Sequence, residues 1–263
     1  MATVTFLGVE GYPMRGRQTI GVLISSGANH LILDCGASIV QQLDNAGVRV
    51  SDVGCVFVSH IHADHSSGVP LMFFGNVMER FFGLTSSKGT LRVIGIESVL
   101  NPLLAYCKTA YPLLWNENPM LHIDESRCAT DAPTNFDLGW CKLTTFPTSH
   151  ALPSVGCSVT VDDRKISFTS DSRRTSDIDS AVGGSDLLIC SILGPNSEAA
   201  ASQKFGFMTP RDAGELAQAT GTRQLALVHI ADTAQRPICH SEASVVFHGN
   251  VLTPANGDKL VID

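Results

Sequence analysis

The chain has 263 residues, of which 44% are hydrophobic and only 16% charged, so it can build a sizeable core and does not have the composition of a disordered polypeptide. Acidic residues outnumber basic ones by 25 to 18, which argues against a broad nucleic-acid surface because phosphate binding needs clustered lysine and arginine. No apolar stretch approaches the ~18 residues of a membrane span, and the N-terminus lacks the features of a signal peptide, so we expect a cytoplasmic protein.

The first part of the chain alternates predicted strands with predicted helices. A short helix is expected from Ser38 to Ala46, ending before Gly47, and a longer one from Ser66 to Phe82, capped by Ser66 or Ser67. The strands are predicted from apolar, β-branched runs separated by turns that contain glycine, at Thr3–Leu7, Ile20–Ile24, His30–Leu33 and Cys55–Ser59.

The segment from about residue 83 to residue 137 is less regular. It carries Tyr106, Tyr111, Trp115 and Phe136 among several prolines. We interpret it as an irregular insertion that forms a lid or a pocket wall. The alternative is an ordinary insertion whose aromatic side chains only pack on the core.

The second half repeats the theme of strands and helices. Helices are predicted at Arg174–Ala181 and Pro210–Ala219, and strands at Cys141–Phe146, Val155–Val161, Lys165–Thr169, Asp186–Ile192 and Gln224–Val228. No linker rich in proline, glycine and serine separates the halves. The pattern therefore favours one domain over residues 1–263, with two packed sheets flanked by helices.

The eight cysteines are scattered without a C-x-x-C pair, and several lie inside apolar runs. Free thiols in such runs pack as small hydrophobic groups. We expect reduced, mostly buried cysteines.

The sharpest chemical signal is His60-Ile61-His62-Ala63-Asp64-His65, directly after an apolar strand. At a strand end, residues i and i+2 point to the same side, so His60 and His62 can bind one ion. Asp64 and His65 lie where the chain turns into the next helix and can face a second ion. Imidazole and carboxylate ligands suit zinc, and two ions ~3.5–4 Å apart can share a hydroxide. Burying so many polar groups without a metal would be costly.

This H-x-H-x-D-H pattern resembles the signature of the metallo-β-lactamase superfamily. In that family a further histidine completes the first metal site, an aspartate bridges the ions and a last histidine completes the second. Here His150, Asp171 and His229 match in that order, and each follows an apolar strand. The resemblance covers nearly the whole chain and implies an αββα sandwich, with two mixed sheets flanked by helices.

Further segments are similar to the branch that contains ribonuclease Z, small phosphodiesterases and arylsulfatases. They are Phe6-Leu7-Gly8 with Gly11-Tyr12-Pro13 and Arg17, the strand end Leu33-Asp34-Cys35-Gly36, and Gly68-Val69-Pro70. The resemblance implies that Asp34 supports the metal loops without binding an ion.

Two departures from that branch affect the expected activity. Ribonuclease Z enzymes typically insert a tRNA-gripping arm between the matches of His150 and Asp171, but here the gap of 171 − 150 = 21 residues leaves no room for one. The segment Gly206-Phe207-Met208-Thr209-Pro210 resembles a short family motif that begins with a histidine contacting the scissile group, and Phe207 takes the place of that histidine.

The resemblance implies a metal-dependent hydrolase in which a hydroxide bridging two divalent ions attacks a small anionic ester, with a phosphodiester or sulfate ester as the first choice. Zinc is the expected metal, with manganese or iron as alternatives. Asp64 and Asp171 are expected to act in catalysis by fixing the ions and orienting the hydroxide. The predicted metal ligands are His60, His62, Asp64, His65, His150, Asp171 and His229.

Phe207 and Arg173 are the predicted substrate contacts. Arg15 with Arg17, and Arg173 with Arg174, form local basic spots that suit one anionic group, with solvated surface arginines as the alternative. The expected partner is a small-molecule substrate, without tRNA or a membrane, and a homodimer is left open.

Two other functions are compatible with these residues. The same hydroxide attacks carbonyl groups, so a lactone, thioester or amide hydrolase is one alternative. The other is a metal-holding binding protein without turnover, which Phe207 motivates.

Overall fold

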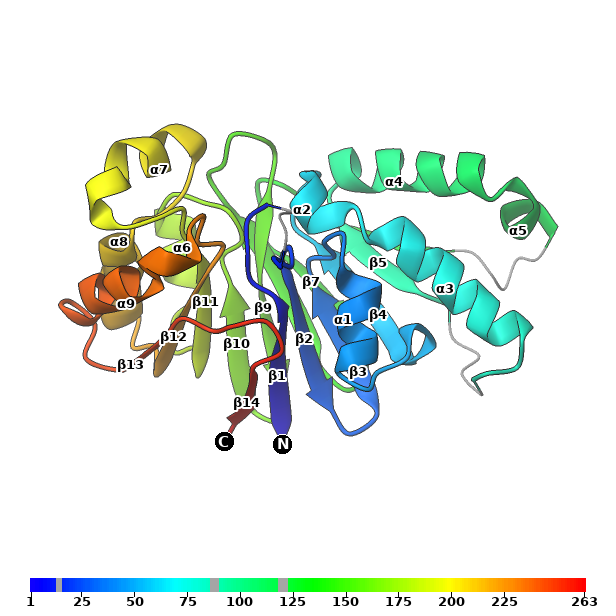
Figure 1. Ribbon diagram of the computed structural model, residues 1–263, viewed down its shortest axis with the longest axis horizontal. Helices are drawn as coiled ribbons and strands as arrows, with labels where there is room; N and C mark the ends of the chain where they lie inside the picture. The colour runs from blue at the N-terminus through cyan, green and yellow to red at the C-terminus, as the bar shows by residue number, and fades with distance from the viewer. Residues whose placement is uncertain (13–15, 86–89, 118–122) are drawn as a thin grey trace.

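The computed structural model describes residues 1–12, 16–85, 90–117 and 123–263. Within these ranges, two seven-stranded sheets pack face to face and helices cover their outer faces (Figure 1). The strand orders are β14-β1-β2-β3-β4-β5-β6 and β13-β12-β11-β10-β9-β8-β7. Each sheet contains both antiparallel and parallel neighbours. The expected αββα sandwich of two mixed sheets is confirmed.

The first sheet is formed by both ends of the chain. Its strands are β1 (Ala2–Gly8), β2 (Gly21–Ser26), β3 (Asn29–Leu33), β4 (Val53–Val58), β5 (Arg92–Gly95), β6 (Asp124–Arg127) and β14 (Lys259–Ile262). Its helices are α1 (Ile39–Asn45), the single-turn α2 (Ala63–Ser66), α3 (Val69–Phe81), α4 (Glu97–Ala110) and α5 (Pro112–Glu117), with a 3-10 turn at Val50–Asp52 before β4.

The second sheet follows in chain order. Its strands are β7 (Thr134–Asp137), β8 (Lys142–Pro147), β9 (Val155–Val161), β10 (Arg164–Phe168), β11 (Leu187–Ser191), β12 (Gln224–Val228) and β13 (Asn250–Leu252). Its helices are α6 (Ser176–Ala181), α7 (Ala199–Phe205), α8 (Pro210–Ala219) and α9 (Arg236–Ser244), with 3-10 turns at Asn196–Glu198 and Thr233–Gln235.

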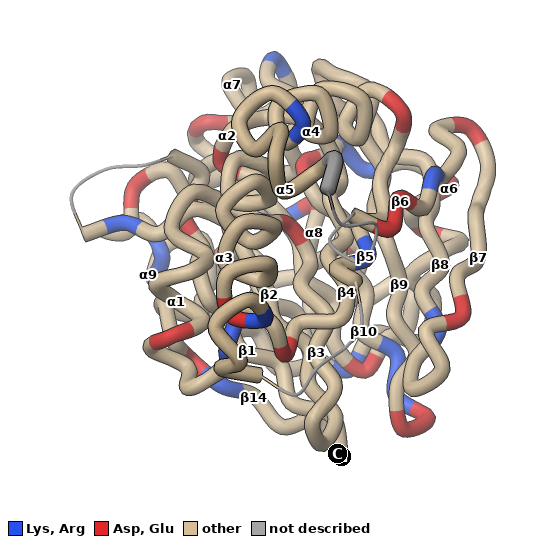
Figure 2. Tube along the Cα trace, turned by 90° about the vertical axis from the view of Figure 1, so that its right-hand side faces the viewer, with Lys and Arg blue, Asp and Glu red and all other residues tan. Residues whose placement is uncertain are grey.

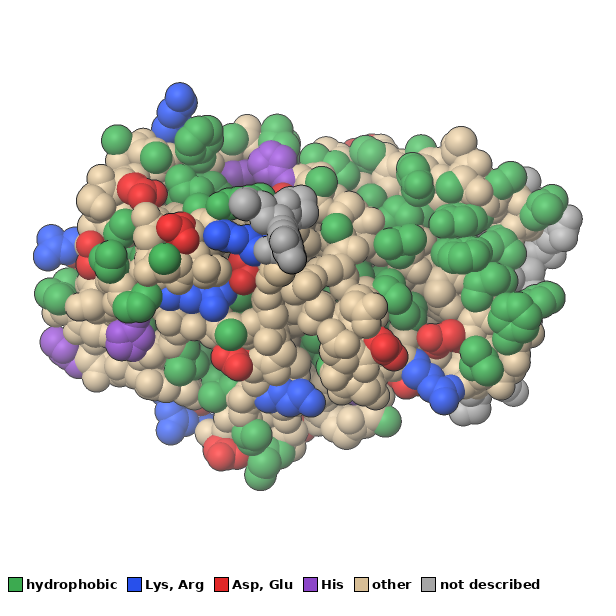
Figure 3. All heavy atoms as spheres, viewed as in Figure 1, with side chains coloured by type: hydrophobic (Ala, Val, Ile, Leu, Met, Phe, Trp, Pro, Cys, Tyr) green, Lys and Arg blue, Asp and Glu red, His purple; other side chains and the backbone are tan. Residues whose placement is uncertain are grey.

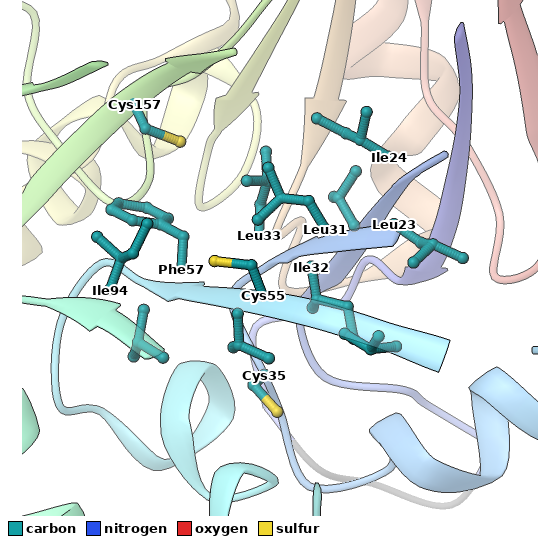
Figure 4. Packing of buried hydrophobic residues seen from close by; sticks show 14 of the residues in the cluster. Leu23, Ile24, Leu31, Ile32, Leu33, Cys35, Cys55, Phe57, Ile94 and Cys157 are labelled. Atoms are coloured by element: carbon teal, nitrogen blue, oxygen red, sulfur yellow. The ribbon is translucent and has the colours of Figure 1, made fainter. Parts of the chain in front are cut away.

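The main core lies between the two sheets. Leu31, Ile32 and Leu33 are all buried, as expected of a strand that is covered on both faces. Figure 4 shows these side chains beside Phe57 of β4, with Cys157 from the opposite sheet in the same cluster. A second cluster packs the outer face of the second sheet against α6, α8 and α9. All eight cysteines are free and buried, as predicted.

The helix predicted over Ser66–Phe82 is interrupted, which corrects the sequence expectation. α2 ends at Ser66, and α3 begins after Gly68 without a side-chain cap. The hydroxyls of Ser66 and Ser67 donate to carbonyls in the preceding turn instead. A Cβ on Gly68 would lie 2.4 Å from the carbonyl oxygen of Gly36, so a tight contact fixes the chain at this break.

The segment from 83 to 137 is more regular than its sequence suggested. Its described residues include β5, α4, α5, β6 and β7, which extend both sheets and cover the first one. The prediction of an irregular insertion is therefore wrong, because strands of four residues gave no alternating pattern. Its role as a lid or pocket wall stays a prediction. No helix among the described residues is long and apolar enough to cross a membrane.

Candidate metal centre

The seven predicted ligands come together at the edge where strands from both sheets end. His60 and His62 follow β4, and α2 carries Asp64 and His65. The second sheet contributes His150 after β8, Asp171 after β10 and His229 after β12. Histidine side chains reach the surface at the upper edge of Figure 3. The seven fall into two groups, His60, His62, His150 and Asp171, and Asp64, His65 and His229, and within each group the ligand atoms lie within 4.8 Å of one another.

In the first group, three imidazole nitrogens face one point. His62 Nδ1 lies 2.9 Å from His60 Nε2 and 3.4 Å from His150 Nε2. Nitrogen ligands 2.0–2.1 Å from a tetrahedral zinc ion are separated by roughly 3.3 Å, so this spacing suits a shared ion. His62 therefore presents Nδ1 to this point, whereas its two neighbours present Nε2.

In the second group, one carboxylate oxygen faces two histidines. Asp64 Oδ2 lies 3.3 Å from His65 Nε2 and 3.2 Å from His229 Nε2. Asp171 stands between the groups, because its Oδ2 lies 3.3 Å from His65 Nε2, 3.4 Å from His229 Nε2 and 3.7 Å from His60 Nε2. This is the position that a bridging ligand requires.

A buried hydrogen-bond network fixes the orientation of the histidines. The Asp34 carboxylate accepts from the backbone N–H of Ser59 (2.8 Å), from the Ser59 hydroxyl (2.9 Å) and from His65 Nδ1 (2.6 Å). The Ser59 oxygen in turn accepts from the Ser170 hydroxyl and from His60 Nδ1. Donation from Nδ1 fixes the rings of His65 and His60 with Nε2 turned toward the ligand groups.

His229 is held in place by close contacts with Val9 and Gly11, which follow β1. The His229 N–H donates to the carbonyl of Val9 (2.7 Å), and a Cβ on Gly11 would lie 2.3 Å from His229 Cε1. Only glycine fits at that position. Three residues around the centre, Asp34, Ser170 and His229, have φ between 53° and 67° although they are not glycine. Backbone strain of this kind persists where the surrounding structure holds it, and it concentrates at functional sites.

The electrostatics favour ionised carboxylates. Burial alone would raise the pKa of Asp171, but His229, His65 and His60 outweigh it and hold that pKa well below its usual range. Burial likewise opposes a charge on His65, yet the carboxylates of Asp171 and Asp34 raise its pKa well above the usual value. Burial, together with the neighbouring His65, lowers the pKa of His60.

The donor set fits divalent metal ions. His65 Nε2 and Asp171 Oδ1 are buried and have no hydrogen-bond partner among the described residues. A buried polar atom without a partner is destabilising, and here two such atoms belong to the two groups of ligands. Imidazole nitrogens and carboxylate oxygens are the ligands that zinc and related ions prefer.

Phe207 lies beside this centre, and its role as a substrate contact stays a prediction. It follows Gly206, whose carbonyl accepts from His150 Nδ1 (3.2 Å). Its ring centroid is 4.8 Å from that of His229 and 5.5 Å from that of His150, so one phenyl ring contacts a histidine of each group. The side chain is nearly buried. It forms an apolar wall beside the ligands.

The predicted basic contacts are engaged elsewhere. Arg173 donates from Nε and a terminal nitrogen to the carbonyl of Gln203, and Arg174 pairs with Asp179. Arg17 donates to the carbonyl of Ala231 and to the Tyr12 hydroxyl. Arg15 lies outside the described residues. A role for Arg173 in substrate binding stays a prediction.

The stretch between His150 and Asp171 contains no arm. Residues 155–168 form the hairpin of β9 and β10, joined by Asp162 and Asp163 with φ of 50° and 60°. Positive φ at both positions is typical of a two-residue hairpin turn.

Comparison with known proteins gives relatives over nearly the whole chain. A ribonuclease Z of Lachnospira eligens is 26% identical over 90% of both chains. The crystal structure of the metallo-β-lactamase fold protein YhfI of Bacillus subtilis matches with a TM-score of 0.82 and 23% identity over 98% of both chains. Human tRNase Z, short form, matches with a TM-score of 0.80 and 19% identity over 99% of both chains.

The fold, the two groups of histidine and aspartate ligands and these relatives show a metallo-hydrolase of the metallo-β-lactamase superfamily, in the branch similar to ribonuclease Z and YhfI. A family model described as "Anti-Pycsar protein Apyc1" matches residues 2–186, which include six of the seven ligands. The chain therefore belongs to the Apyc1 family of anti-Pycsar proteins.

Proposed function

We propose that the protein hydrolyses a small phosphodiester at the centre formed by the two ligand groups. The observation that carries the proposal is the position of Asp171, whose Oδ2 lies 3.3–3.7 Å from histidines of both groups. A carboxylate shared in this way supports two ions in one site. Two divalent ions, with zinc as the first choice, would supply Lewis acidity and lower the pKa of a water molecule there.

The chain's own residues provide binding and orientation. His60, His62 and His150 would hold one ion, and Asp64, His65 and His229 the other, with Asp171 between them. Asp64 is partly exposed, with its side chain 17% accessible, so it can accept a hydrogen bond from water that enters the site. Phe207 would exclude water from one side of the substrate.

The choice of a phosphodiester rests on the relatives. The relatives above include a ribonuclease Z and a tRNase Z, whose names denote cleavage of RNA phosphodiesters. A sulfate ester is the closest variant of the same chemistry. Carboxyl chemistry on a lactone, thioester or amide is the second candidate, and Phe207 favours it, because attack on a carbonyl needs no histidine to contact a phosphate.

Hydrolysis by the metal-loaded protein tests this proposal. Protein loaded separately with Zn²⁺, Mn²⁺ or Fe²⁺ would be assayed on bis(p-nitrophenyl) phosphate, p-nitrophenyl sulfate, a lactone and an acyl thioester. We expect the phosphodiester to be the best substrate. His62→Ala should abolish hydrolysis with the fold retained, whereas His248→Ala, an exposed histidine outside both groups, should remain active. Faster lactone or thioester turnover would favour carboxyl chemistry, and metal binding without turnover would favour a binding protein.

We further propose that tRNA is not the substrate. Acidic residues exceed basic ones, and the β9–β10 hairpin fills the place where an arm would be inserted. A polyanion of that size needs many basic contacts, and its binding weakens steeply with salt. Efficient, salt-sensitive cleavage of a precursor tRNA at a single position would contradict this.

A further inference from the structure

The chain between β11 and α8 leaves the second sheet and returns to it beside the metal centre. Ile192 and Met208 pair as an isolated β-bridge, so the two ends of this excursion lie side by side. Residues 193–207 are called the α7 loop below, because α7 is their main element. Figures 1 and 2, turned by 90° from one another, both show α7 at the edge of the molecule where α2 lies. The loop ends on Phe207, whose ring contacts two of the ligands.

The first residues of the α7 loop are anchored by side chains from outside the metal centre. The backbone N–H of Asn196 donates to the Glu242 carboxylate (2.7 Å), and the side-chain amide of Gln235 donates to Glu198 (2.7 Å). Glu242 belongs to α9, and Gln235 to the 3-10 turn before it. This part of the loop is therefore held independently of the ligands.

α7 itself has little apolar anchorage. Among its seven residues, Ala199–Phe205, the buried side chain is that of Ser202, and the aromatic residue, Phe205, is 50% exposed. Isolated helices of this length are not stable in water, so a helix this short needs tertiary contacts. The position of α7 therefore depends on polar contacts with its neighbours.

Arg173 supplies such a contact from the loop that carries Asp171. Its Nε and a terminal nitrogen donate to the Gln203 carbonyl at 3.0 Å and 2.5 Å. The backbone N–H of Arg173 donates to the carbonyl of Ser149, the residue before His150 (2.9 Å). Its backbone is thus fixed beside two ligands, while its planar guanidinium directs two donors at one oxygen of α7. Arg173 connects the ligand loops to α7.

The end of the α7 loop carries this contact on to His150. The Phe207 N–H donates to the Ser202 carbonyl (2.8 Å), so residues 206 and 207 are continuous with α7. The Gly206 carbonyl accepts from His150 Nδ1 (3.2 Å), and a Cβ on Gly206 would lie 3.0 Å from the same atom. A shift of α7 would therefore move both the carbonyl that orients His150 and the ring that lies against it.

We propose that Arg173 is a positioning residue of the metal centre, which acts through α7 and not by contact with a substrate. By holding the Gln203 carbonyl, it keeps the Gly206 carbonyl on His150 and the Phe207 ring beside the ligands. Its effect on metal binding stands independently of the proposed function, whereas its effect on turnover rests on that function. Direct contact of Arg173 with an anionic group of the substrate, as expected from the sequence, is the competing interpretation.

Two substitutions at Arg173 separate the interpretations. Arg173→Met keeps a long, unbranched side chain but removes its donors. Arg173→Lys keeps the positive charge but replaces the rigid two-donor fork by a flexible ammonium group. A positioning role is lost in both variants, whereas attraction of an anionic substrate is largely retained by lysine. Arg174→Met and Arg174→Lys are matched controls, because Arg174 is the next residue in the chain and pairs with Asp179 of α6.

Hydrogen exchange of backbone amides measures the hold on α7 without metal or substrate. In both Arg173 variants of the full, metal-free chain, the amides of Gly206 and Phe207 should exchange about 10-fold faster than in the wild type. This is the lower end of the effect of a hydrogen bond to a charged group, because Arg173 is partly exposed. The amides of β12 should keep wild-type exchange, and the Arg174 variants should keep it in the α7 loop.

Zinc titration measures the consequence at the ligands. Loss of a partner behind a metal-binding histidine weakens metal binding ~10–100-fold, and Arg173 acts one contact further away. We therefore expect about 10-fold weaker binding of the ion held by the group of His150 in both Arg173 variants. The second ion should be weakened less, because His229 is also held by Val9 and Gly11. The Arg174 variants should bind zinc as the wild type does.

A double-variant cycle tests whether Arg173 acts through Gly206. Gly206→Ala disturbs the contact with His150 directly, since its Cβ would lie 3.0 Å from His150 Nδ1 at a φ of 80°. If both residues act along one line of contacts, adding Arg173→Met to Gly206→Ala should weaken zinc binding further by less than ~3-fold. Circular dichroism and thermal unfolding would establish that each variant is folded.

Steady-state kinetics of the zinc-saturated protein on bis(p-nitrophenyl) phosphate give a separate readout. A positioning role lowers kcat in both Arg173 variants and leaves KM nearly unchanged. A substrate contact instead raises KM in Arg173→Met and preserves it in Arg173→Lys. If the wild type does not hydrolyse this ester, the proposed function fails, and hydrogen exchange and zinc binding still decide the role of Arg173.

Four results would overturn the proposal. Unchanged exchange in the α7 loop of Arg173→Met would show that Arg173 does not hold α7. Faster exchange with wild-type zinc affinity would make the contact structural only. Additive losses in the double variant would reject transmission through Gly206. Near-wild-type behaviour of Arg173→Lys beside a raised KM in Arg173→Met would assign Arg173 to the substrate.

Discussion

Replacing Asp34 by asparagine tests how the protein orients its predicted metal ligands, because Asp34 hydrogen-bonds to His65 and is not itself one of those ligands. Asp34 is fully buried and accepts three hydrogen bonds, from the Ser59 backbone N–H, the Ser59 hydroxyl and His65 Nδ1. Asparagine keeps one acceptor oxygen but places an NH₂ group opposite donors. Because Asp34 has φ of 57°, which asparagine also tolerates, Asp34→Asn removes the carboxylate without adding backbone strain, whereas alanine would add it.

The expected loss follows from those contacts. One or two donors remain buried without an acceptor, which costs about 1–3 kcal/mol of folding free energy. Loss of a carboxylate behind a metal-binding histidine typically weakens metal binding ~10–100-fold. We expect this loss mainly at the group of Asp64, His65 and His229, because His65 donates directly to Asp34.

The assay is a zinc competition titration with a chelator, combined with thermal unfolding of the metal-free and zinc-loaded forms. Asp163→Asn is the matched control, since Asp163 also has positive φ (60°) but lies exposed in the β9–β10 turn. Wild-type affinity for both ions in Asp34→Asn would refute the reasoning, and so would equal weakening of both ions.

Three further predictions concern the same centre. Gly11→Ala should lower the metal content toward one ion per chain, because the new Cβ would lie 2.3 Å from His229 Cε1, and elemental analysis after zinc loading measures it. The metal-free protein should lose stability as pH rises from 6.5 through the elevated folded pKa of His65, because the stability contributed by protonated His65 is fully present only below the ordinary pKa of 6.5. It should also lose stability as pH falls below 3.8, the ordinary pKa of an aspartate, because the folded pKa of Asp171 is lowered. Thermal unfolding across pH checks this, and a metal-free protein that becomes steadily more stable from pH 6 to 9 would contradict it. Phe207→His should flatten the dependence of rate on leaving-group pKa across a series of aryl phosphodiesters, because imidazole can donate a proton, an effect worth ~10²–10⁴, and phenyl cannot. A flat dependence in the wild type would show that Phe207 only packs.

The ligands could be predicted from the sequence because their positions follow strand ends. A strand that is buried on both faces has a continuous apolar run, and the polar residue at its end must lie at the sheet edge. His229 follows such a run in β12, whereas Asp171 and His150 follow β10 and β8, which place buried Ser167 and Thr145 among their apolar residues. All three lie after strand ends, so the packing of the two sheets is enough to bring them to His60–His65. The orientation of the imidazole rings could not be predicted in this way. It depends on Ser59 and Ser170, whose hydroxyls come from different sheets and make one network.

The sequence did not predict the elements whose limits are set by tertiary contacts. β6 has the sequence Asp124-Glu125-Ser126-Arg127, which is polar throughout because the strand lies at a sheet edge. The break between α2 and α3 depends on the contact of Gly68 with the Gly36 carbonyl, which is 32 residues away in the chain. The apolar pattern of α3 is equally compatible with either of its faces being inside, and only the structure shows which of its apolar residues are buried.

The order of strands in the second sheet explains why Asp171 lies between the two groups of predicted ligands. β10 lies midway between β8 and β12, so Asp171 at its end stands between His150 and His229. From the first sheet, His60 and His65 face these three residues. Their Nε2 atoms lie 3.7 Å and 3.3 Å from Asp171 Oδ2. Asp171→Asn should therefore weaken both ions, whereas His150→Ala should weaken one and His229→Ala the other. Zinc titration of the three variants measures this, and loss of a single ion in Asp171→Asn would assign the aspartate to one group alone.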